Sequence, residues 1–539
     1  MRGKLVSLLP VSFISLTSSS VTLLSIISLS VMSLLLIPLS LTSSLTLSPF
    51  LSSVVSPLSA SAAETVNCPP KPIPNQPIAE TGEGPNLGPI EGRITQEVIT
   101  SGISLGEIQN AGLRIFTTPF NKHDGYGDGP FYLAEGDPRQ PGNRPTLQGN
   151  GTFLRVNGID GQTCLECHFI TRNSTIPATL GIAGIAGGAN HPIARPSFIN
   201  VADGTGAQVP GTNPGDMNGR FINPPFLFGS GGIELVGKEM TVCLQKLKDK
   251  AIAHPNTIVT LEALGVNFGT IVYSGGTLDT SNVVGVNEDL VVRPFGRKGS
   301  FPAIRSFDLD AMQFHFGMQP VEVVGADNDA DHDGVVNELL PGEVSALHIF
   351  LTTRPKPVVN KPNQEISQGF KIFAQIGCTD CHVPYFITKS KKLTYSYPEV
   401  QTDPTANVFY EVDLTKTANF KPSGYGGIIV PSLSDLKRHD MGPDLAESFD
   451  LVSEKANREF ITARLWGVRD TAPYLHDGRA TTITDAILKL GGEAQVARDK
   501  FNALDQSKKD KVIAFLYSLR TPLDNTQVSF EDDLLSVQK

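Results

Sequence analysis

The chain has 539 residues and a formal net charge of −10, with 40% hydrophobic and 18% charged residues. This is the composition of an ordinary globular protein, long enough for about two to four domains. The acidic balance argues against nucleic acid as a partner. The 51 glycines and 39 prolines predict long irregular connections between short elements.

Residues 1–62 are expected to be a targeting segment. Arg2 and Lys4 are followed by a long uncharged stretch that ends in Ala60-Ser-Ala62. This ending is the cleavage pattern of a secretory signal peptide. Since residues 21–40 are apolar over the length of a membrane span, an uncleaved membrane anchor is the alternative. Both interpretations predict export to the periplasm or an equivalent extracytoplasmic compartment.

A Pro-rich linker is predicted over residues 63–100. A first domain follows over residues 101–254. Its apolar spacing predicts helices over 105–116 and 237–254. A Gly/Asp-rich turn cluster and the first of two cysteine motifs lie between these helices.

Two pentapeptides carry the chemistry of this chain: Cys164-Leu-Glu-Cys167-His168 and Cys378-Thr-Asp-Cys381-His382. Each is the signature of a covalently attached c-type haem, in which two thiols bind the porphyrin and the histidine is the proximal iron ligand. A zinc site would need further Cys or His pairs at similar spacing, and a redox dithiol would not need the histidine. The sequence therefore predicts two haem c groups, which also agrees with export.

Residues 255–353 are expected to form an intervening segment. Short apolar runs alternate with Gly, Asn and Asp up to about residue 310, which predicts strands and turns. A helix is predicted over 341–353. Between them, aspartates at alternate positions precede Gly334, which is typical of the first half of a calcium loop.

The candidate calcium ligands are Asp329, Asp331, Asp333, Val335 and Glu338. The twelfth position of this loop is Leu340, which excludes a full EF-hand, so Glu338 or Glu343 would have to close the site. The alternative is a solvated acidic turn.

A C-terminal cytochrome c domain is predicted over residues 354–522, followed by a polar tail over 523–539. Its helices are expected over 364–377, leading into the second cysteine motif, and over 506–520. The predicted fold is therefore mainly α, with two cytochrome c-like haem domains, long irregular loops and a small strand-containing insertion between them.

The two remaining cysteines are Cys68 and Cys243. They pair as a disulfide in an oxidising compartment, or they are one exposed thiol and one buried apolar side chain.

Residues 465–480, which include Ala472-Pro-Tyr-Leu-His-Asp-Gly478, resemble the C-terminal signature of bacterial di-haem cytochrome c peroxidases. Residues 439–446 and 486–494 are similar to blocks of the related di-haem oxidoreductase family. The resemblance implies one haem with an open distal position, where a small oxidant such as peroxide reacts. It also implies a second haem that relays electrons from an external donor such as a small redox protein.

The chain departs from this resemblance at two positions. Leu490 stands where the relatives place a Met or His ligand of the C-terminal haem, so Met441 is the first candidate distal ligand and His439 the next. The relatives also place a tryptophan between the haems. Phe228 occupies that position here, and the single tryptophan is Trp466. Electron transfer then uses Trp466 or runs directly between the haem edges.

The resemblance also suggests groups for proton transfer at the open haem. His191 lies in a context like that of a removable distal histidine, with a surface loop histidine as the alternative. Glu234 and Glu239 fall where the relatives keep a distal carboxylate, with an ordinary helix-surface role as the alternative. His315, flanked by two Met and two Phe, belongs either to a haem-ligating loop or to a packed core strand.

The leading functional hypothesis is an exported di-haem oxidoreductase of peroxidase type. The alternatives are an electron-transfer cytochrome without catalytic activity and an enzyme that oxidises a side chain of a partner protein.

Overall fold

The structure is a computed structural model that describes residues 80–82, 92–126, 163–164, 168, 224–225, 227–330, 334–360, 362–447 and 453–522. All of them belong to one compact unit, Ile73 to Lys539. The expected targeting segment, the polar tail and the loop around His191 lie outside the described residues.

The N-terminal part is built on two packed helices, α2 (Leu105–Thr117) and α7 (Pro341–Thr352). Ser104 and Glu107 form a capping box that starts α2. Gly112 allows the close approach, because a Cβ there would lie 2.2 Å from the Ala346 carbonyl oxygen. Both helices agree with the sequence prediction. The short α1 (Gln96–Thr100) also packs on α7.

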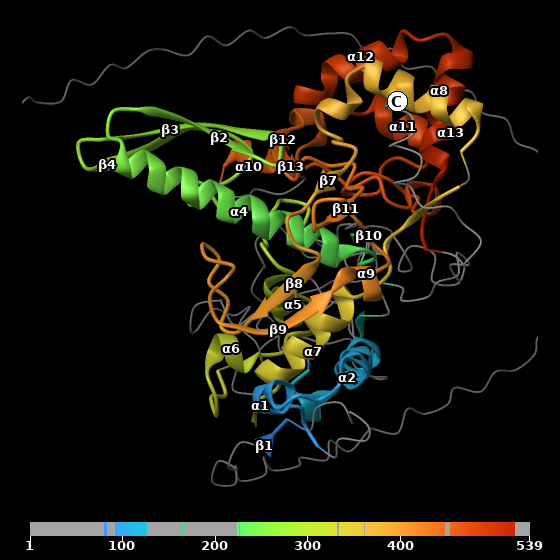
Figure 1. Ribbon diagram of the computed structural model, residues 1–539. Coiled ribbons are helices and arrows are strands. Elements are labelled where there is room, and N and C mark those ends of the chain that lie inside the picture. The colour runs from blue at the N-terminus through green and yellow to red at the C-terminus, as the bar shows by residue number, and fades with distance from the viewer. Residues whose placement is uncertain are drawn as a thin grey trace, which may run out of the picture. The chain divides into compact units, whose positions relative to one another are not determined.

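The longest described helix is α4 (Ser230–Ala253), which carries a three-stranded antiparallel sheet along one side (Figure 1). The strands are β2 (Ile258–Ala263), β3 (Val266–Ser274) and β4 (Thr277–Val283). The helix begins seven residues before its predicted start. Two glycines stand in this first turn because other segments approach it closely. A Cβ at Gly231 would meet the Thr352 carbonyl, and a Cβ at Gly232 would meet the Phe420 ring.

The segment that follows the sheet contains short elements. They are α5 (Ile304–Ala311), a π-helical turn η4 (Met312–Phe316), α6 (Val321–Val324) and β5 (Val335–Val336). Strand β5 pairs in parallel with β1 (Glu80–Thr81). The 3-10 turn η1 (Lys122–Asp124) follows α2 along the chain.

A separate helical core surrounds the second cysteine motif. Helix α8 (Gln364–Gln375) packs against α13 (Gln506–Tyr517), and α11 (Ile483–Leu488) and α12 (Gln495–Asn502) lie with them (Figure 1). Short 3-10 turns connect this region: η5 (Cys378–Asp380), η7 (Val468–Asp470) and η8 (Gly492–Ala494).

The prediction of a mainly α fold is wrong. The described chain contains six small sheets, five of them antiparallel, and several strands lie where a helical cytochrome domain was expected. Those strands are β6 (Val358–Val359), β7 (Phe386–Ile387), β8 (Lys392–Ser396), β9 (Val408–Asp413), β10 (Lys421–Pro422), β11 (Ile428–Val430), β12 (Arg438–Asp440), β13 (Glu459–Ile461) and β14 (Leu519–Arg520).

Strand β8 shows why strands form here, because its side chains alternate between buried and exposed positions. In β8, Leu393 and Tyr395 are buried while Lys392 is exposed, which is the two-residue period of a strand. These side chains join the core of α4 and α7 rather than the helical core around α8. The small helices α9 (Leu414–Thr417) and α10 (Glu454–Arg458) and the turn η6 (Pro443–Leu445) connect the strands.

Within the described part of the chain, none of the helices combines the length and apolar character needed to cross a membrane.

Candidate functional site

The second cysteine motif is positioned by the end of α8. Asn363 caps the start of this helix, and its side chain accepts the Ile366 amide at 2.8 Å. Gly377, with φ of 95°, ends it and turns the chain into η5. The His382 amide then donates to the Cys378 carbonyl at 2.9 Å. Both thiols and the histidine therefore come from one tight turn.

The ring of His382 is fixed by a distant backbone carbonyl. Its Nδ1 lies 2.8 Å from the carbonyl oxygen of Leu433, 51 residues later in the chain. Burial lowers the pKa of His382, so the imidazole is neutral at neutral pH. Histidines that bind metal through Nε2 are held in the same way through Nδ1. The donor set of two thiols and an oriented neutral imidazole fits a covalently attached haem.

Neither thiol of this motif forms a disulfide. Cys378 and Cys381 are both free and partly buried. Burial, reinforced by the nearby Asp380, raises the pKa of Cys378 to about 12. Cys378 therefore stays protonated and has little reactivity as a thiolate of its own accord.

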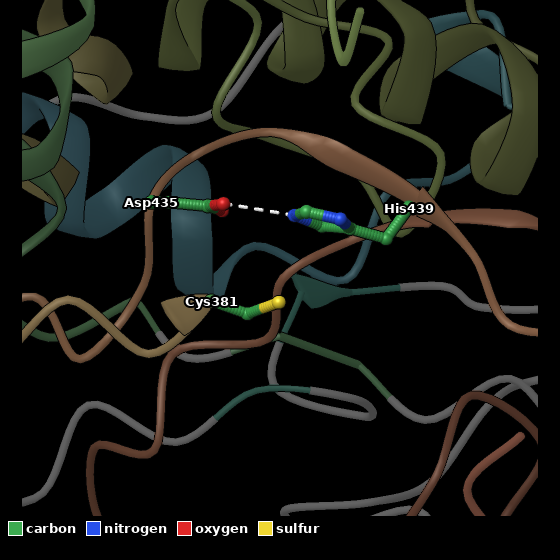
Figure 2. A group of neighbouring side chains, drawn as sticks. All are labelled: Cys381, Asp435 and His439. Atoms are coloured by element: carbon green, nitrogen blue, oxygen red, sulfur yellow. Dashed lines mark hydrogen bonds and ion pairs between the residues drawn. The ribbon is translucent and has the colours of Figure 1, made fainter. Parts of the chain in front are cut away.

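Cys381 of this motif forms a close group with Asp435 and His439 (Figure 2). His439 Nε2 lies 2.8 Å from Asp435, and its Nδ1 lies 2.7 Å from Glu493. Burial opposes a charge on His439, but the bonds to Asp435 and Cys381 outweigh it and raise its pKa to about 11. With both ring nitrogens bound to carboxylates, His439 offers no lone pair to iron in this arrangement.

Met441, the other candidate distal ligand, directly follows β12. Its amide donates to the Arg458 carbonyl at 3.0 Å, and its carbonyl lies against Gly491. Leu490, next to that glycine, has its carbonyl bound by Arg498 at 3.0 Å. The distal ligand of this haem stays a prediction, with Met441 as the candidate.

The first cysteine motif is described at Cys164 and His168, while Cys167 lies outside the described residues. The His168 amide donates to the Cys164 carbonyl at 2.9 Å, as in the second motif. Its ring donates to the Pro225 carbonyl. Burial, with a smaller effect of the nearby His315, lowers the pKa of His168 to about 4. The two histidines thus share burial, neutrality and a carbonyl partner.

His315 lies in the π-helical turn η4, not in a core strand. Its neighbours Met312, Phe316 and Met318 are buried. His315 lies near His168 and contributes, after burial, to the lowered pKa of that ring.

The two candidate distal carboxylates both have hydrogen-bond or ion-pair partners. Glu234 is fully buried and binds His348 at 2.9 Å and Lys238 at 2.7 Å. Burial acts to raise the pKa of Glu234, but these two positive partners outweigh it and lower it. Glu239 accepts the amides of Lys389 and Ser390 at 2.8 to 2.9 Å. Their role in proton transfer stays a prediction.

The predicted calcium loop is described only in part, because Asp331 and Asp333 lie outside the described residues. Asp329 accepts the Gly334 amide at 3.1 Å. Glu338 is buried and accepts the Gln319 amide at 2.7 Å, and Val335 belongs to β5. The calcium site stays a prediction. Cys243 is a free thiol, and Cys68 lies outside the described residues.

Trp466 lies between the segments that hold the two motif histidines. Its side chain is buried, and its Nε1 donates to the Pro431 carbonyl, two residues before Leu433. Its ring also packs on Gly229, four residues after Pro225, where a Cβ would lie 2.5 Å from the indole. Phe228, next to Gly229, is buried as well. One indole therefore contacts both segments.

Comparison with known proteins agrees with these motifs. The model of the family described as "Di-haem oxidoreductase, putative peroxidase" matches residues 352–519. This part of the chain is similar to that family. The match contains the second cysteine motif, His439, Trp466 and the helical core around α8. The description of this family supports a general oxidoreductase role and suggests haem as the cofactor.

Other comparisons add little. No curated protein matches the chain. One solved structure with similarity is titled "Kuenenia stuttgartiensis Hydrazine Synthase Pressurized with 20 bar Xenon", with 16% identity and a TM-score of 0.23. The match covers 40% of this chain and 60% of that one, so the chain spans less than two thirds of that protein's length.

Sequence reasoning missed the backbone partners of the site. The carbonyls of Leu433 and Pro225 give no signal in a sequence, because any residue can supply them. His348 had no recognisable context either, although a lone histidine in the largely apolar helix α7 was a usable hint.

Proposed function

We propose that the chain is an exported c-type cytochrome oxidoreductase that carries two covalently bound haems. It reduces peroxide or another small oxidant with electrons from an external donor. The observation that carries this proposal is the geometry of the second motif. Two free thiols and a neutral, carbonyl-oriented His382 come from one turn, within the region that matches the di-haem family.

Bound haem supplies an iron that exchanges single electrons and accepts an axial ligand. The residues of this chain hold it in place. The thiols of Cys378 and Cys381 are positioned to anchor the porphyrin. The Leu433 carbonyl fixes the tautomer of His382 and increases the basicity of its Nε2. The Pro225 carbonyl does the same for His168.

The position of Trp466 supports electron exchange between the two sites. Its indole contacts both the Pro431 and the Gly229 segments, each a few residues from the carbonyl that holds a motif histidine. A buried aromatic group in that position shortens the gap that an electron must cross. This assigns to Trp466 the role that the related peroxidases give to a tryptophan at the position of Phe228.

Peroxide reduction also needs a group that moves protons at the open iron. His191 is the candidate for this role. Glu234 is held as an ion-paired carboxylate, so a role in proton transfer would require it to leave Lys238 or His348.

Export is supported by the sequence of residues 1–62 and by the chemistry of haem c, which is attached outside the cytoplasm. Expression with and without residues 1–62 tests this. We expect haem-loaded protein in the periplasmic fraction only when the segment is present.

The proposed activity is tested by absorption and electron paramagnetic resonance spectra of the purified ferric protein. We expect one high-spin component, which shifts when peroxide is added. Two six-coordinate low-spin spectra that peroxide leaves unchanged would contradict the proposal and identify an electron-transfer cytochrome.

A further inference from the structure

Away from the cysteine motifs, three side chains with metal-binding groups meet in the protein interior. They are Glu234 on α4, His348 on α7 and Glu399 in the segment between β8 and β9. One ligand atom of each lies within 4.8 Å of the other two. Glu234 is 0% and His348 1% exposed. Residues from three separate elements therefore converge on one buried point.

Carboxyl groups crowd together at this buried point. The carboxyl of Asp308 is buried next to Glu234 and Glu399. Lys238 binds Glu234 at 2.7 Å. Arg305, the other nearby cation, is bound to Glu322 at 2.5 Å and to Ser345 at 2.7 Å. Three carboxyl groups thus face Lys238 and the ring of His348. Burying them together is unfavourable without a further cation or bound protons.

Two buried polar atoms at this place lack a hydrogen-bond partner among the described residues. They are Oδ2 of Asp308, in a residue 5% exposed, and Oγ of Ser396, in a residue 3% exposed. Buried polar atoms without a partner are uncommon, and an ion or its bound water is a usual explanation. These atoms are independent of the three side chains that form the group.

A small cavity borders Glu399, one member of the group. Its lining includes Lys238, Ser396 and Glu399, and it has a volume of about 20 Å³. This is enough for one water molecule or one ion. Ser396 Oγ and Glu399 therefore border a space of the right size.

We propose that Glu234, His348 and Glu399 bind one divalent transition-metal ion, of the Mn²⁺ or Zn²⁺ class, beside this cavity. One imidazole nitrogen with two carboxylates suits these ions better than calcium, which prefers oxygen ligands only. On binding, the ion takes the place of the hydrogen bond between His348 Nε2 and Glu234. The ion ties α4, α7 and the β8–β9 segment together. This site does not depend on the proposed haem function.

Manganese is the probe of choice because its pulsed electron paramagnetic resonance spectrum detects nitrogen ligands. The haem-loaded protein is stripped with a chelator and titrated with Mn²⁺. We expect about one tightly bound ion per chain with coupling to one imidazole nitrogen. His348→Gln removes the nitrogen coupling. It also weakens binding by at least about ten-fold, since even groups that only support a ligand contribute that much.

Glu399→Gln is the second variant. Glu399 is partly exposed, so the change is tolerated by the fold, and we expect the same weakening of Mn²⁺ binding with the nitrogen coupling retained. The matched control is Glu411→Gln on β9, which breaks only an exposed pair with Lys392 at 2.8 Å. It should bind Mn²⁺ as the wild type does.

Three results would overturn the proposal. The first is a protein that binds no Mn²⁺, which would mean that Lys238 and His348 are sufficient partners for the carboxyl groups. The second is Mn²⁺ bound without nitrogen coupling, as at an oxygen-only site such as the acidic loop at Asp329. The third is unchanged affinity in both His348→Gln and Glu399→Gln.

Discussion

The contact between α8 and α13 supports the turn that carries the second cysteine motif, and Gly369 allows it. A Cβ at this position would lie 1.9 Å from the Lys511 carbonyl oxygen and 2.7 Å from its carbonyl carbon. Both atoms belong to the backbone of α13, so no side chain can move aside. Gly369→Ala must therefore push the two helices apart and disturb the core formed by Phe370 and Phe515.

The magnitude follows from two opposing effects. Overpacking of this kind costs about 1–3 kcal/mol, and backbone contact favours the upper part of that range. The higher helix propensity of alanine compared with glycine offsets this by up to about 1 kcal/mol. We expect a net loss of about 1–2 kcal/mol in the free energy of unfolding. Because α8 leads directly into Cys378, haem loading at this motif should fall as well.

The control is Gly106→Ala in the first turn of α2. A Cβ there comes no closer than 3.9 Å to Ser104 Oγ, and the position is exposed. The same substitution should stabilise this helix by up to about 1 kcal/mol. Urea unfolding of the haem-loaded proteins, followed by far-ultraviolet circular dichroism, gives both differences. If Gly369→Ala unfolds at the wild-type midpoint or above it, the close contact between α8 and α13 is refuted.

Three further predictions follow from individual contacts. Trp466 is the single tryptophan and is buried, so its fluorescence should be quenched by haem in the folded protein and recover in urea. Trp466→Phe leaves the Pro431 carbonyl without its donor and should lower the free energy of unfolding by about 1–3 kcal/mol. The same change should slow electron exchange between the haems, measured by stopped-flow reduction. Unchanged kinetics would exclude Trp466 as the route. Arg93 binds Glu343 at 2.5 Å and three backbone carbonyls. Arg93→Met should therefore lower the free energy of unfolding by about 3 kcal/mol. Lys392→Met, in the exposed pair with Glu411, should lower it by less than about 1 kcal/mol. Equal effects would contradict the burial of the first pair. Burial lowers the pKa of His476 to about 4, below its ordinary value of 6.5. Between these two pH values the unfolded chain binds more protons than the folded one, so stability falls as the pH drops from 6.5 to 4. His476→Gln should make this part of the plot of stability against pH flatter. An identical slope would show that His476 does not contribute.

The sequence predicted the helices whose start signals are local. Pro341 stands at the first position of α7, and Asn363 caps α8, so both starts were found. The start of α4 was missed because Gly231 and Gly232 weaken the helical pattern. Their reason is tertiary, namely the close approach of Thr352 and Phe420.

The strands between residues 386 and 430 were missed for a different reason. The haem motif suggested a helical cytochrome unit, and this took precedence over the alternating pattern of Lys392–Ser396. The side chains of β8 pack on α4, more than a hundred residues earlier in the chain. A local pattern does not reveal such a partner.

The cysteines and histidines were predicted as haem-attachment residues from their spacing, and this stays a prediction. The groups that orient them could not be predicted. The partner of His382 is the Leu433 carbonyl, 51 residues away, and a carbonyl has no residue type. The position of His439 between two carboxylates likewise depends on Glu493, which only the fold brings near.

The central claim is that both motifs bind haem covalently. It is tested most directly by pyridine haemochrome titration and intact mass of the protein matured in a host that attaches haem c. We predict about two haem groups per chain, and about one after Cys378→Ala with Cys381→Ala or after Cys164→Ala with Cys167→Ala. A wild-type protein with fewer than two covalent haems would contradict the account.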